Sequence, residues 1–467
     1  MSKNTPSSST TTRRDFFRMS AMTAAVFGAE SSLLAADTRK AAASAGRAKN
    51  VIFMVSDGMN HGALSMAHLY RKHFEQKTTQ WLDMYRERPV VRCLAETYSA
   101  NSVVTDSAAA ASAWGCGQRV NNGTLNMLPG GGEGRTIHQK LDEKGIKTGL
   151  VTTATITHAT PAGFAINQHS RGDEAEIAAQ YLERKVDVLL GGGQKFFSPE
   201  LRGKYTTAGY DLVNNRDALR KLSNDKLKPL LGLFYDSYIP FTLDRLHDKA
   251  IAAQVPTLSE MAQVALDRLS HGKDGFFLMI EGARIDHAGH QNDAAASIQD
   301  QLAFDDAIGV ALKFIDTNPE TLLIVTTDHG CGGIQMNGVS KGAGQGFAPG
   351  IYNASTPYFE NIRSIRHSFE WMKQQKLDGL SGPKLAEVLE QHTGYKVAAD
   401  KLKDLQGMKP ANVGKLMQDY HGVGWTSQNH TGELVEFCAY GPGSKNFPAL
   451  MENRQVHDLV LQAMEVT

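Results

Sequence analysis

Five short apolar runs constrain the fold of this 467-residue chain more than any other feature. They cover residues 50–56, 148–153, 186–190, 276–280 and 321–326. The runs are rich in β-branched and aromatic residues, and they show little of the alternation expected for a strand with one wet face. Strands that are apolar on both sides are typical of a parallel sheet covered by helices on both faces.

Amphipathic helical patterns lie between these runs, at Ile177 to Arg184, Leu258 to Leu269 and Ala294 to Phe314. The alternation predicts an α/β fold, a three-layer α/β/α sandwich with a mostly parallel central sheet. Ligands of such sheets bind beyond the carboxyl ends of the strands. We therefore expect the chemistry to lie where the apolar runs end.

Charge and composition exclude some classes of protein. The chain has 49 Lys and Arg against 49 Asp and Glu, so net charge cannot hold it on a polyanion, and we expect no nucleic-acid-binding module. Hydrophobic residues make up 41% of the chain, which is too apolar for intrinsic disorder. The composition indicates a globular protein.

Residues 1–45 are typical of an export leader. A Ser/Thr-rich start leads to the Arg13-Arg14 pair, then to a weakly apolar run at 19–27 and to small residues. That run is shorter than the roughly 20 residues that span a bilayer. We predict a twin-arginine signal cleaved near residue 36 or 45, a mature chain of residues 46–467 and a periplasmic or secreted protein, the alternative being a disordered arm with a chance Arg pair.

Four cysteines, Cys93, Cys116, Cys331 and Cys438, are widely spaced and form no C-x-x-C pair. An oxidising compartment permits two disulfides among them, in three possible pairings. Buried free thiols are the alternative, and the sequence leaves both open.

Three of the apolar runs end at residue types that commonly bind metals. Asp57 follows the first run, Asp328-His329 follow the last, and Glu281 follows the run at 276–280. Beyond Glu281, Asp286 and His290 are four residues apart, so on one helical turn they could bind the same cation. Mixed carboxylate and imidazole ligands suit zinc. Capping or hydrogen bonding is the simpler explanation of any single pair, but three clusters at strand ends of one sheet favour a metal centre.

Ser107 is the candidate nucleophile. It precedes the alanine-rich string 108–111, where free N–H groups and the dipole at the start of a helix favour a phosphoryl group. An ordinary helix cap by Asp106 or Ser107 is the simpler reading of this string alone. The chain has no G-x-S-x-G elbow, so a nucleophilic serine here would need a metal to activate it.

Several long motifs together resemble alkaline phosphatases. They occur in the family's order: KNVIFMVSDGMN, VTDSAAAASAW, TITHATPAGF, DVLLGGGQKFF, FFLMIEGARIDHAGH, LLIVTTDHG and TSQNHTGE. They cover residues 50–330 almost continuously and resume near residue 425. The resemblance implies hydrolysis of phosphate monoesters through a phosphoserine, with two Zn²⁺ and one Mg²⁺, in a homodimer.

The resemblance also assigns roles by position. Ser107 would be the nucleophile, and Arg171 would hold two phosphate oxygens with its planar fork, which Lys cannot copy. The implied ligands are Asp286, His290 and His430 for the first zinc, Asp57, Asp328 and His329 for the second, and Asp57, Thr160 and Glu281 for magnesium.

Two positions depart from the best-known bacterial pattern. His158 replaces an Asp, and His287 replaces a Lys, as in the animal enzymes and other bacterial members. We expect both histidines to lie next to the metal ligands without binding the metals directly. We also expect His158 to change how tightly the magnesium site holds its ion. Added magnesium should therefore activate the enzyme.

Residues 332–425 match the family motifs least well. A glycine-rich string at 338–350 precedes helical patterns around 364–375 and 385–405. We interpret this region as a subdomain inserted near the active site, which either shapes substrate choice or is a passive lid or oligomer contact.

Two other functions compete with phosphomonoesterase. Phosphodiesterases and sulfatases share this core, although the chain has no C-x-P-x-R sulfatase string. The other alternative is an exported protein that binds metal or phosphate without turnover. The sequence does not identify the natural substrate, nor whether the protein associates with a membrane.

Overall fold

The computed structural model describes residues 46–222, 228–338, 356–375, 380–405 and 409–466. The predicted leader, residues 1–45, and nearly all of the glycine-rich string at 338–350 lie outside these ranges. Among the described residues, no helix is both long enough and apolar enough to cross a bilayer.

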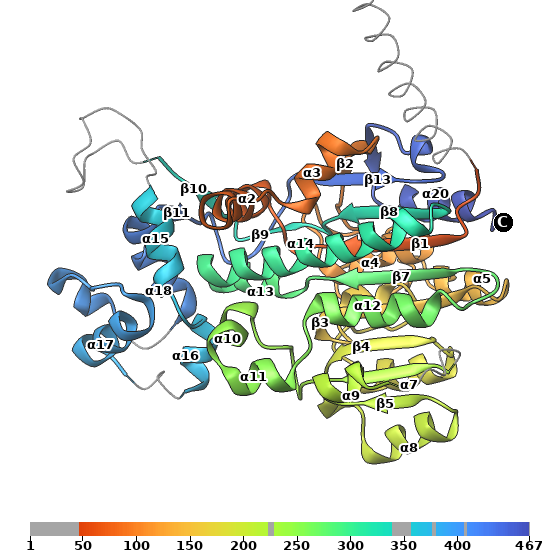
Figure 1. The fold of residues 1–467 in the computed structure, drawn as a ribbon, viewed down its shortest axis with the longest axis horizontal. Helices are drawn as coiled ribbons and strands as arrows, with labels where there is room; N and C mark the ends of the chain where they lie inside the picture. The colour runs from red at the N-terminus through yellow and green to blue at the C-terminus, as the bar shows by residue number, and fades with distance from the viewer. Residues whose placement is uncertain (1–45, 223–227, 339–355, 376–379, 406–408, 467) are drawn as a thin grey trace, which may run out of the picture.

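A ten-stranded sheet forms the centre of the molecule (Figure 1), in the order β14-β2-β13-β8-β1-β7-β3-β4-β6-β5. All neighbours pair in parallel except β13, which is antiparallel to both β2 and β8. The strands are β1 (Asn50–Val55), β2 (Val91–Glu96), β3 (Lys147–Thr155), β4 (Val188–Gly192), β5 (Asp211–Val213), β6 (Leu230–Leu233), β7 (Phe276–Glu281), β8 (Thr321–Thr326), β13 (Val435–Tyr440) and β14 (Leu450–Glu452).

The five predicted strands are confirmed as β1, β3, β4, β7 and β8, and they are five consecutive neighbours at the centre of this sheet. Their central position explains why they were visible in the sequence, since a strand buried on both faces needs apolar residues throughout. The sheet strands not predicted from the sequence lie outside them. β5, β6 and β14 are short and β2 alternates between buried and exposed residues, whereas β13 is six residues long and almost wholly buried.

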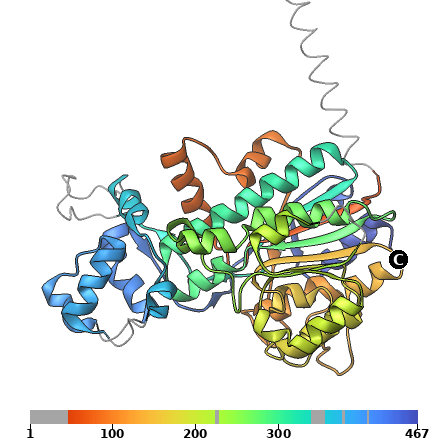
Figure 2. The same ribbon diagram turned by 60° about the horizontal axis from the view of Figure 1, so that its bottom comes forward.

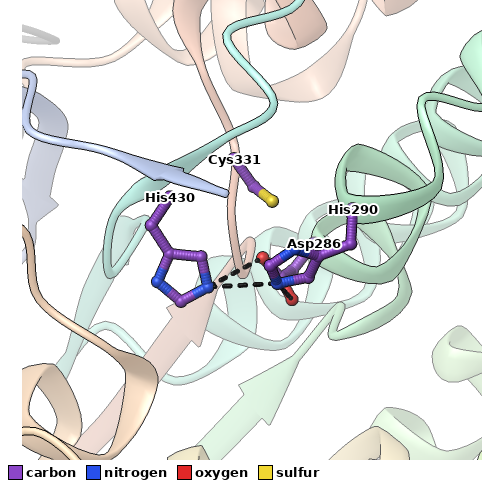
Figure 3. Close-up of side chains that lie close together, drawn as sticks. All are labelled: Asp286, His290, Cys331 and His430. Atoms are coloured by element: carbon purple, nitrogen blue, oxygen red, sulfur yellow. Dashed lines mark hydrogen bonds and ion pairs between the residues drawn. The ribbon is translucent and has the colours of Figure 1, made fainter. Parts of the chain in front are cut away.

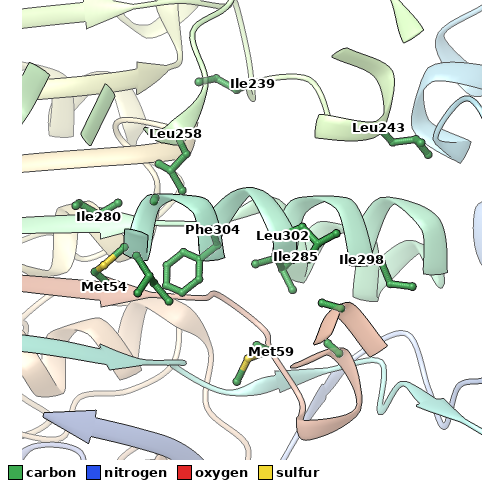
Figure 4. Packing of buried hydrophobic residues seen from close by; sticks show 14 of the residues in the cluster. Met54, Met59, Ile239, Leu243, Leu258, Ile280, Ile285, Ile298, Leu302 and Phe304 are labelled. Carbon is green, nitrogen blue, oxygen red and sulfur yellow. The ribbon is translucent and has the colours of Figure 1, made fainter. Parts of the chain in front are cut away.

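Successive residues of β1 pack on opposite faces of the sheet, which gives the three layers. Ile52 and Met54 belong to one hydrophobic core, and Val51, Phe53 and Val55 belong to the other. Figure 4 shows Met54 and Ile280 beside Phe304 of the long helix that covers the first face. The predicted α/β/α sandwich is therefore confirmed.

Helices cover both faces of the sheet. The first core includes residues of α2 (His61–Glu75), α3 (Gln80–Glu87), α12 (Leu258–Leu269) and α14 (Ala294–Thr317). The second includes residues of α4 (Ser107–Cys116), α5 (Ile137–Asp142), α7 (Glu174–Glu183) and α20 (Gln455–Met464). The other helices up to residue 291 are α6 (Ala159–Gly163), α8 (Pro199–Thr207), α9 (Arg216–Arg220), α10 (Thr242–His247), α11 (Lys249–Gln254) and α13 (Arg284–Gln291).

A helical lobe, the described residues between 335 and 424, projects from one end of the sandwich (Figures 1 and 2). The chain enters and leaves it through two short antiparallel pairs, β9 (Gly330–Cys331) with β12 (His430–Thr431) and β10 (Gln335–Met336) with β11 (Val423–Gly424). The lobe holds α15 (Thr356–Ser364), α16 (Phe369–Gln374), α17 (Gly382–Thr393), α18 (Pro410–Leu416), α19 (Gln418–His421) and a 3-10 turn at Ala399–Asp404.

The helical patterns predicted in this region are each divided in the structure. The one around 364–375 begins at the last residue of α15 and contains the whole of α16, where the Ser368 hydroxyl caps the new helix by accepting from the Trp371 N–H. The one around 385–405 ends its α-helix at Thr393, before Gly394 in a left-handed conformation. Periodicity located the helices, whereas caps decided where they stop.

All four cysteines are buried free thiols. Of the two alternatives that the sequence left open, disulfides or buried free thiols, the structure shows free thiols.

Candidate active site

The strand ends bring the predicted acids together because the register of the sheet aligns them. Val55 of β1 pairs with Glu281 of β7 on one side and with Thr326 of β8 on the other. Asp57, Glu281 and Asp328 therefore emerge at the same edge of the sheet, and all three are fully buried.

Gly58 permits the helix α13 to approach this edge. Its φ is +70°, and a Cβ there would lie 2.6 Å from the Asp286 Cα atom. Any side chain would therefore combine backbone strain with a clash against backbone. The glycine after Asp57 is needed so that Asp286 can reach the strand ends.

The buried acids are short of partners. Both carboxylate oxygens of Asp57, Oε1 of Glu281 and Oδ2 of Asp328 have no hydrogen-bond partner among the described residues. Burial, followed by the neighbouring carboxylate of Asp328, raises the pKa of Asp57 well above its usual range, and burial raises the pKa of Glu281 to about 7. Buried carboxylates without compensation are costly, so this set fits a bound cation.

Ser107 lies beside His329. Asp106 caps α4 by accepting from the Ala109 N–H, which leaves Ser107 as the first helical residue, buried, with its Oγ 3.2 Å from His329 Nε2. The same ring nitrogen lies 3.1 Å from Asp328 Oδ2 and 3.7 Å from Asp57 Oδ1. Asp106 is therefore the residue that caps the helix. The Ser107 hydroxyl instead lies beside His329, whose ring contacts two of the buried acids.

Arg171 is held in place from two sides. Its Nη1 donates to Asp106 Oδ2 at 3.0 Å, and its Nη2 lies 3.1 Å from His158 Nε2. Asp106 also accepts from the Gly123 N–H, so one carboxylate orients the start of α4, a loop and the guanidinium. Sequence reasoning treated Asp106 only as a possible cap, because nothing in the local string shows that Arg171 folds against it.

A second group of side chains that could bind a metal, called the rim cluster below, consists of Asp286, His290 and His430 (Figure 3). Asp286 and His290 are one turn apart on α13, and His430 comes from β12. The His290 and His430 Nε2 atoms are 3.2 Å apart and lie 3.3 and 3.6 Å from Asp286 Oδ2 and Oδ1, respectively. Ligands at the corners of a zinc tetrahedron, with bonds of about 2.0–2.3 Å, stand about 3.3–3.8 Å apart, so the three side chains fit such an ion.

The outer nitrogens of both rim histidines bind backbone carbonyls. His290 Nδ1 lies 2.5 Å from the Gln428 oxygen, and His430 Nδ1 lies 2.8 Å from the Thr105 oxygen. Such bonds fix the ring and leave the other nitrogen free to bind a metal. Burial lowers the pKa of His430 to about 4, whereas the ion pair with Asp286 outweighs burial and raises the pKa of His290 to about 9.

Thr160, His158 and His287 complete the predicted set. Thr160 is fully buried on α6, with a hydroxyl that has no hydrogen-bond partner among the described residues. His158 offers a ligand atom within 4.8 Å of those of Asp57 and Glu281, so it lies among possible ligands as well as beside Arg171. The His287 ring is turned toward Arg284, whose Nη1 is 2.6 Å from His287 Nδ1.

Among the residues that the structure describes, three groups could hold metal ions, each with ligand atoms within 4.8 Å of one another. They are Asp57 with Asp286 and His329, Asp57 with His158 and Glu281, and Asp286 with His290, Cys331 and His430. Cys331 was missed as a ligand type in the sequence, although it follows His329 by only two residues.

The sequence was compared with protein-family models and with known proteins, and it matches alkaline phosphatases in both. The family model for alkaline phosphatase matches residues 48–466. The chain belongs to the alkaline phosphatase family. It is 32% identical to alkaline phosphatase 3 of Bacillus subtilis over 439 residues, which cover 89% of each chain, and 31% identical to the repressible alkaline phosphatase of Saccharomyces cerevisiae over 458 residues, 87% of this chain and 78% of that one.

A solved structure supports the same assignment. The crystal structure of Thermus thermophilus alkaline phosphatase superposes with a TM-score of 0.81 at 30% identity, covering 90% of this chain and 92% of that one. The predicted enzyme class is confirmed: as an alkaline phosphatase, the protein is a phosphoric monoester hydrolase.

Proposed function

We propose that this alkaline phosphatase hydrolyses phosphate monoesters through a phosphoserine on Ser107, at a site that binds two Zn²⁺ and one Mg²⁺. The observation that carries the proposal is the position of the Ser107 hydroxyl. It lies at the N-terminus of α4, 3.2 Å from His329 Nε2, and that ring contacts the buried carboxylates of Asp57 and Asp328, several of whose oxygens have no hydrogen-bond partner among the described residues. A helix N-terminus favours a phosphoryl group, and the acids favour cations beside it.

The residues present fit the metals. Asp286, His290 and His430 would hold the first zinc, Asp57, Asp328 and His329 the second, and Asp57, Thr160 and Glu281 the magnesium. The all-oxygen set suits magnesium, and the mixed oxygen and nitrogen sets suit zinc. When bound, the cations would lower the pKa of the serine hydroxyl and stabilise charge on the attacking and departing oxygens.

The protein groups then have defined tasks. The N–H groups at the start of α4 would bind phosphate oxygens, while Ser107 attacks the phosphorus in line with the leaving group. Arg171, oriented by Asp106, would hold two equatorial oxygens, which carry the charge of the transferring group. Hydrolysis of the phosphoserine then releases inorganic phosphate.

His158 supports a further expectation about magnesium. Its imidazole lies among the candidate ligands at the position where an Asp would supply a negative charge, and burial followed by the charge of Arg171 lowers its pKa to about 3. A neutral ring in that place should weaken the magnesium site. Titrating magnesium into chelated enzyme should raise activity in a saturable way, and no response at any concentration would refute this.

The family resemblance and the sequence also support proposals about assembly, export and the inserted subdomain. We propose a homodimer exported by the twin-arginine route, with the subdomain at 332–425 influencing substrate choice. A polar cleft where the lobe meets the end of α13 supports that last role, being lined by Asn292, Asn412, Lys415, Gln418, Trp425, Thr426, Ser427 and Gln428.

Paired substrates test the proposal directly. The protein, chelated and refilled with zinc and magnesium, should hydrolyse p-nitrophenyl phosphate much faster than bis-p-nitrophenyl phosphate at alkaline pH. Rapid quenching in acid should trap phosphate on Ser107. Preference for the diester would favour the phosphodiesterase alternative, and binding of phosphate without hydrolysis of either ester would favour a binding protein.

A further inference from the structure

Three aromatic rings lie together beside Arg171, and one of them, Tyr238, has no task in the mechanism proposed above. Its ring centroid is 4.4 Å from that of His287 and 6.1 Å from that of His158, whose Nε2 contacts the Arg171 guanidinium. All three residues are partly exposed, and the Arg171 side chain is 28% exposed. These three rings, called the aromatic wall below, therefore lie where the phosphate-binding side of the site meets solvent.

The backbone on both sides of Tyr238 is fixed to the sheet. The Ser237 carbonyl accepts from the Gly193 N–H at 2.8 Å, and the Ile239 N–H donates to the Thr153 carbonyl at 3.0 Å. The Ile239 side chain belongs to the hydrophobic core (Figure 4). The Tyr238 ring is thus carried by an anchored segment, and binding against an anchored side chain costs less conformational entropy than ordering a free one.

A buried cation supports the ring. The Arg284 guanidinium carbon lies 5.4 Å from the Tyr238 ring centroid, and its Nη1 lies 2.6 Å from His287 Nδ1. The same guanidinium stacks over the Phe241 ring at 3.8 Å, which fixes its own position. A cation at such a distance attracts an aromatic ring. Tyr238 is therefore held in the aromatic wall by contacts that do not use its solvent-facing side.

In-line chemistry directs the leaving group toward this part of the site. Ser107 is buried, and a nucleophile that attacks in line sends the leaving group to the opposite side of the phosphorus. That side must open to solvent, because the ester group of the substrate enters and leaves there. Arg171, which would hold the phosphate oxygens, is in contact with the aromatic wall on its own partly exposed side.

We propose that Tyr238 is a specificity-determining residue whose ring contacts the leaving group and favours phosphate monoesters of aromatic alcohols over those of alkyl alcohols. This inference rests on the roles proposed above for Ser107 and Arg171. Two aromatic rings attract each other in offset or edge-to-face arrangements beyond the gain from buried apolar area. A hydrated alkyl alcohol such as glycerol has no such attraction to the ring.

Two monoesters test the proposal. With the enzyme refilled with zinc and magnesium, kcat/KM is measured for p-nitrophenyl phosphate and for glycerol 2-phosphate. Tyr238→Leu should lower the ratio of the two values by about three- to tenfold, with a higher KM for the aromatic ester. Its activity on glycerol 2-phosphate and its inhibition by inorganic phosphate should stay within about twofold of the parent, because neither ligand uses the ring.

Two further variants are controls. Tyr238→Phe keeps the ring and should keep the parent ratio. Tyr235→Leu changes an exposed tyrosine of the same segment that takes no part in the aromatic wall, and it should leave both esters unaffected.

The outcomes separate this inference from the proposed function. An equal loss for both esters in Tyr238→Leu would overturn the inference, since it would show that Tyr238 only supports His287 and His158, and an unchanged ratio would overturn it as well. If Tyr238→Leu does not fold, inhibition of the parent decides: phenylphosphonate should bind at least about threefold more tightly than methylphosphonate, and equal binding would overturn the inference. Failure of the parent to hydrolyse either ester would overturn the proposed function instead.

Discussion

The strand-end site and the helical lobe are built in different ways. At the strand ends, the hydrogen-bond register of β1, β7 and β8 fixes where Asp57, Glu281 and Asp328 emerge, and these residues are fully buried. The lobe instead joins the sandwich through short strand pairs, through apolar contacts such as Tyr70 with Phe359, and through polar side chains, among them Arg284 with Glu370. The difference predicts that substitutions at the first region change catalysis, whereas those at the junction change stability.

Removing the Ser107 hydroxyl should have the largest effect. Ser107→Ala removes the proposed nucleophile, so kcat/KM for p-nitrophenyl phosphate should fall by at least about a thousandfold while the melting temperature stays close to that of the parent. Ser112→Ala is the matched control on the same helix, because the Ser112 hydroxyl accepts from the Asn126 N–H and lies in the core. It should cost stability and keep activity. Equal activity losses in both would show that Ser107 has no special role.

Arg171→Lys should come next. Lysine keeps the charge but loses the planar fork that pairs with Asp106 and, on our proposal, binds two phosphate oxygens. The value of kcat/KM should therefore fall by roughly a hundredfold, with weaker inhibition by inorganic phosphate. Arg184→Lys, outside the site, provides the comparison, since Arg184 donates to Asn167. Parent-like inhibition by phosphate in Arg171→Lys would argue against the clamp.

At the junction, Glu370→Gln should change stability more than activity. Arg284 is almost fully buried, stacks over the Phe241 ring at 3.8 Å and is paired with Glu370 at 2.6 Å. Taking away the carboxylate leaves the guanidinium poorly compensated, and we expect the free energy of unfolding to fall by about 1–3 kcal/mol. Urea unfolding measures this.

The control for that variant is an exposed ion pair within the lobe. Lys401 and Asp419 are 3.3 Å apart, and the Asp419 side chain is 86% exposed. Asp419→Asn should leave the unfolding midpoint unchanged, because solvent screens such pairs. A loss as large as that of Glu370→Gln would mean that burial does not distinguish the two contacts.

The smallest effect should be a change of pH dependence at Asp293, which joins α14 to the lobe. Its carboxylate accepts from the Ala296 and Phe369 N–H groups, and burial raises its pKa to about 7. The folded protein thus binds this proton more tightly than the unfolded chain, whose Asp has a pKa of about 3.9. The stabilisation is complete below about pH 4 and is lost as the pH rises through about 7.

Asp293→Asn removes that titration. The difference in unfolding free energy between the two proteins should therefore move in favour of the variant as the pH rises from about 4 to 8, which urea unfolding at several pH values would measure. A difference that stays constant across this range would show that Asp293 does not titrate there.

Most of the candidate site could be predicted because its residues follow strands that the sequence makes visible. Glu281 ends a strand that is buried on both faces, Asp57 and Asp328 each lie two residues beyond such a strand, and parallel strands bring their carboxyl ends to one edge. Asp286 and His290 followed from helical spacing. The family motifs, rather than any local physical signal, identified Arg171, Thr160 and His430.

Other features depended on contacts between distant parts of the chain. Asp106 reads as an ordinary cap in the sequence, yet its second oxygen orients Arg171, 65 residues away. Cys331 lies beside the rim cluster only because β9 pairs with β12, which returns to the sheet after the whole lobe. Neither contact has a period or a spacing that a sequence pattern could report.

The sequence alone specifies the buried parallel strands, the helices that cover them and the acids at the strand ends, because burial on both faces and helical periodicity leave local patterns. Packing decides which of those groups lie close enough to share a cation, how Arg171 is oriented and that the four cysteines are free thiols. These depend on distances between residues far apart in the chain, which packing sets and no local pattern encodes.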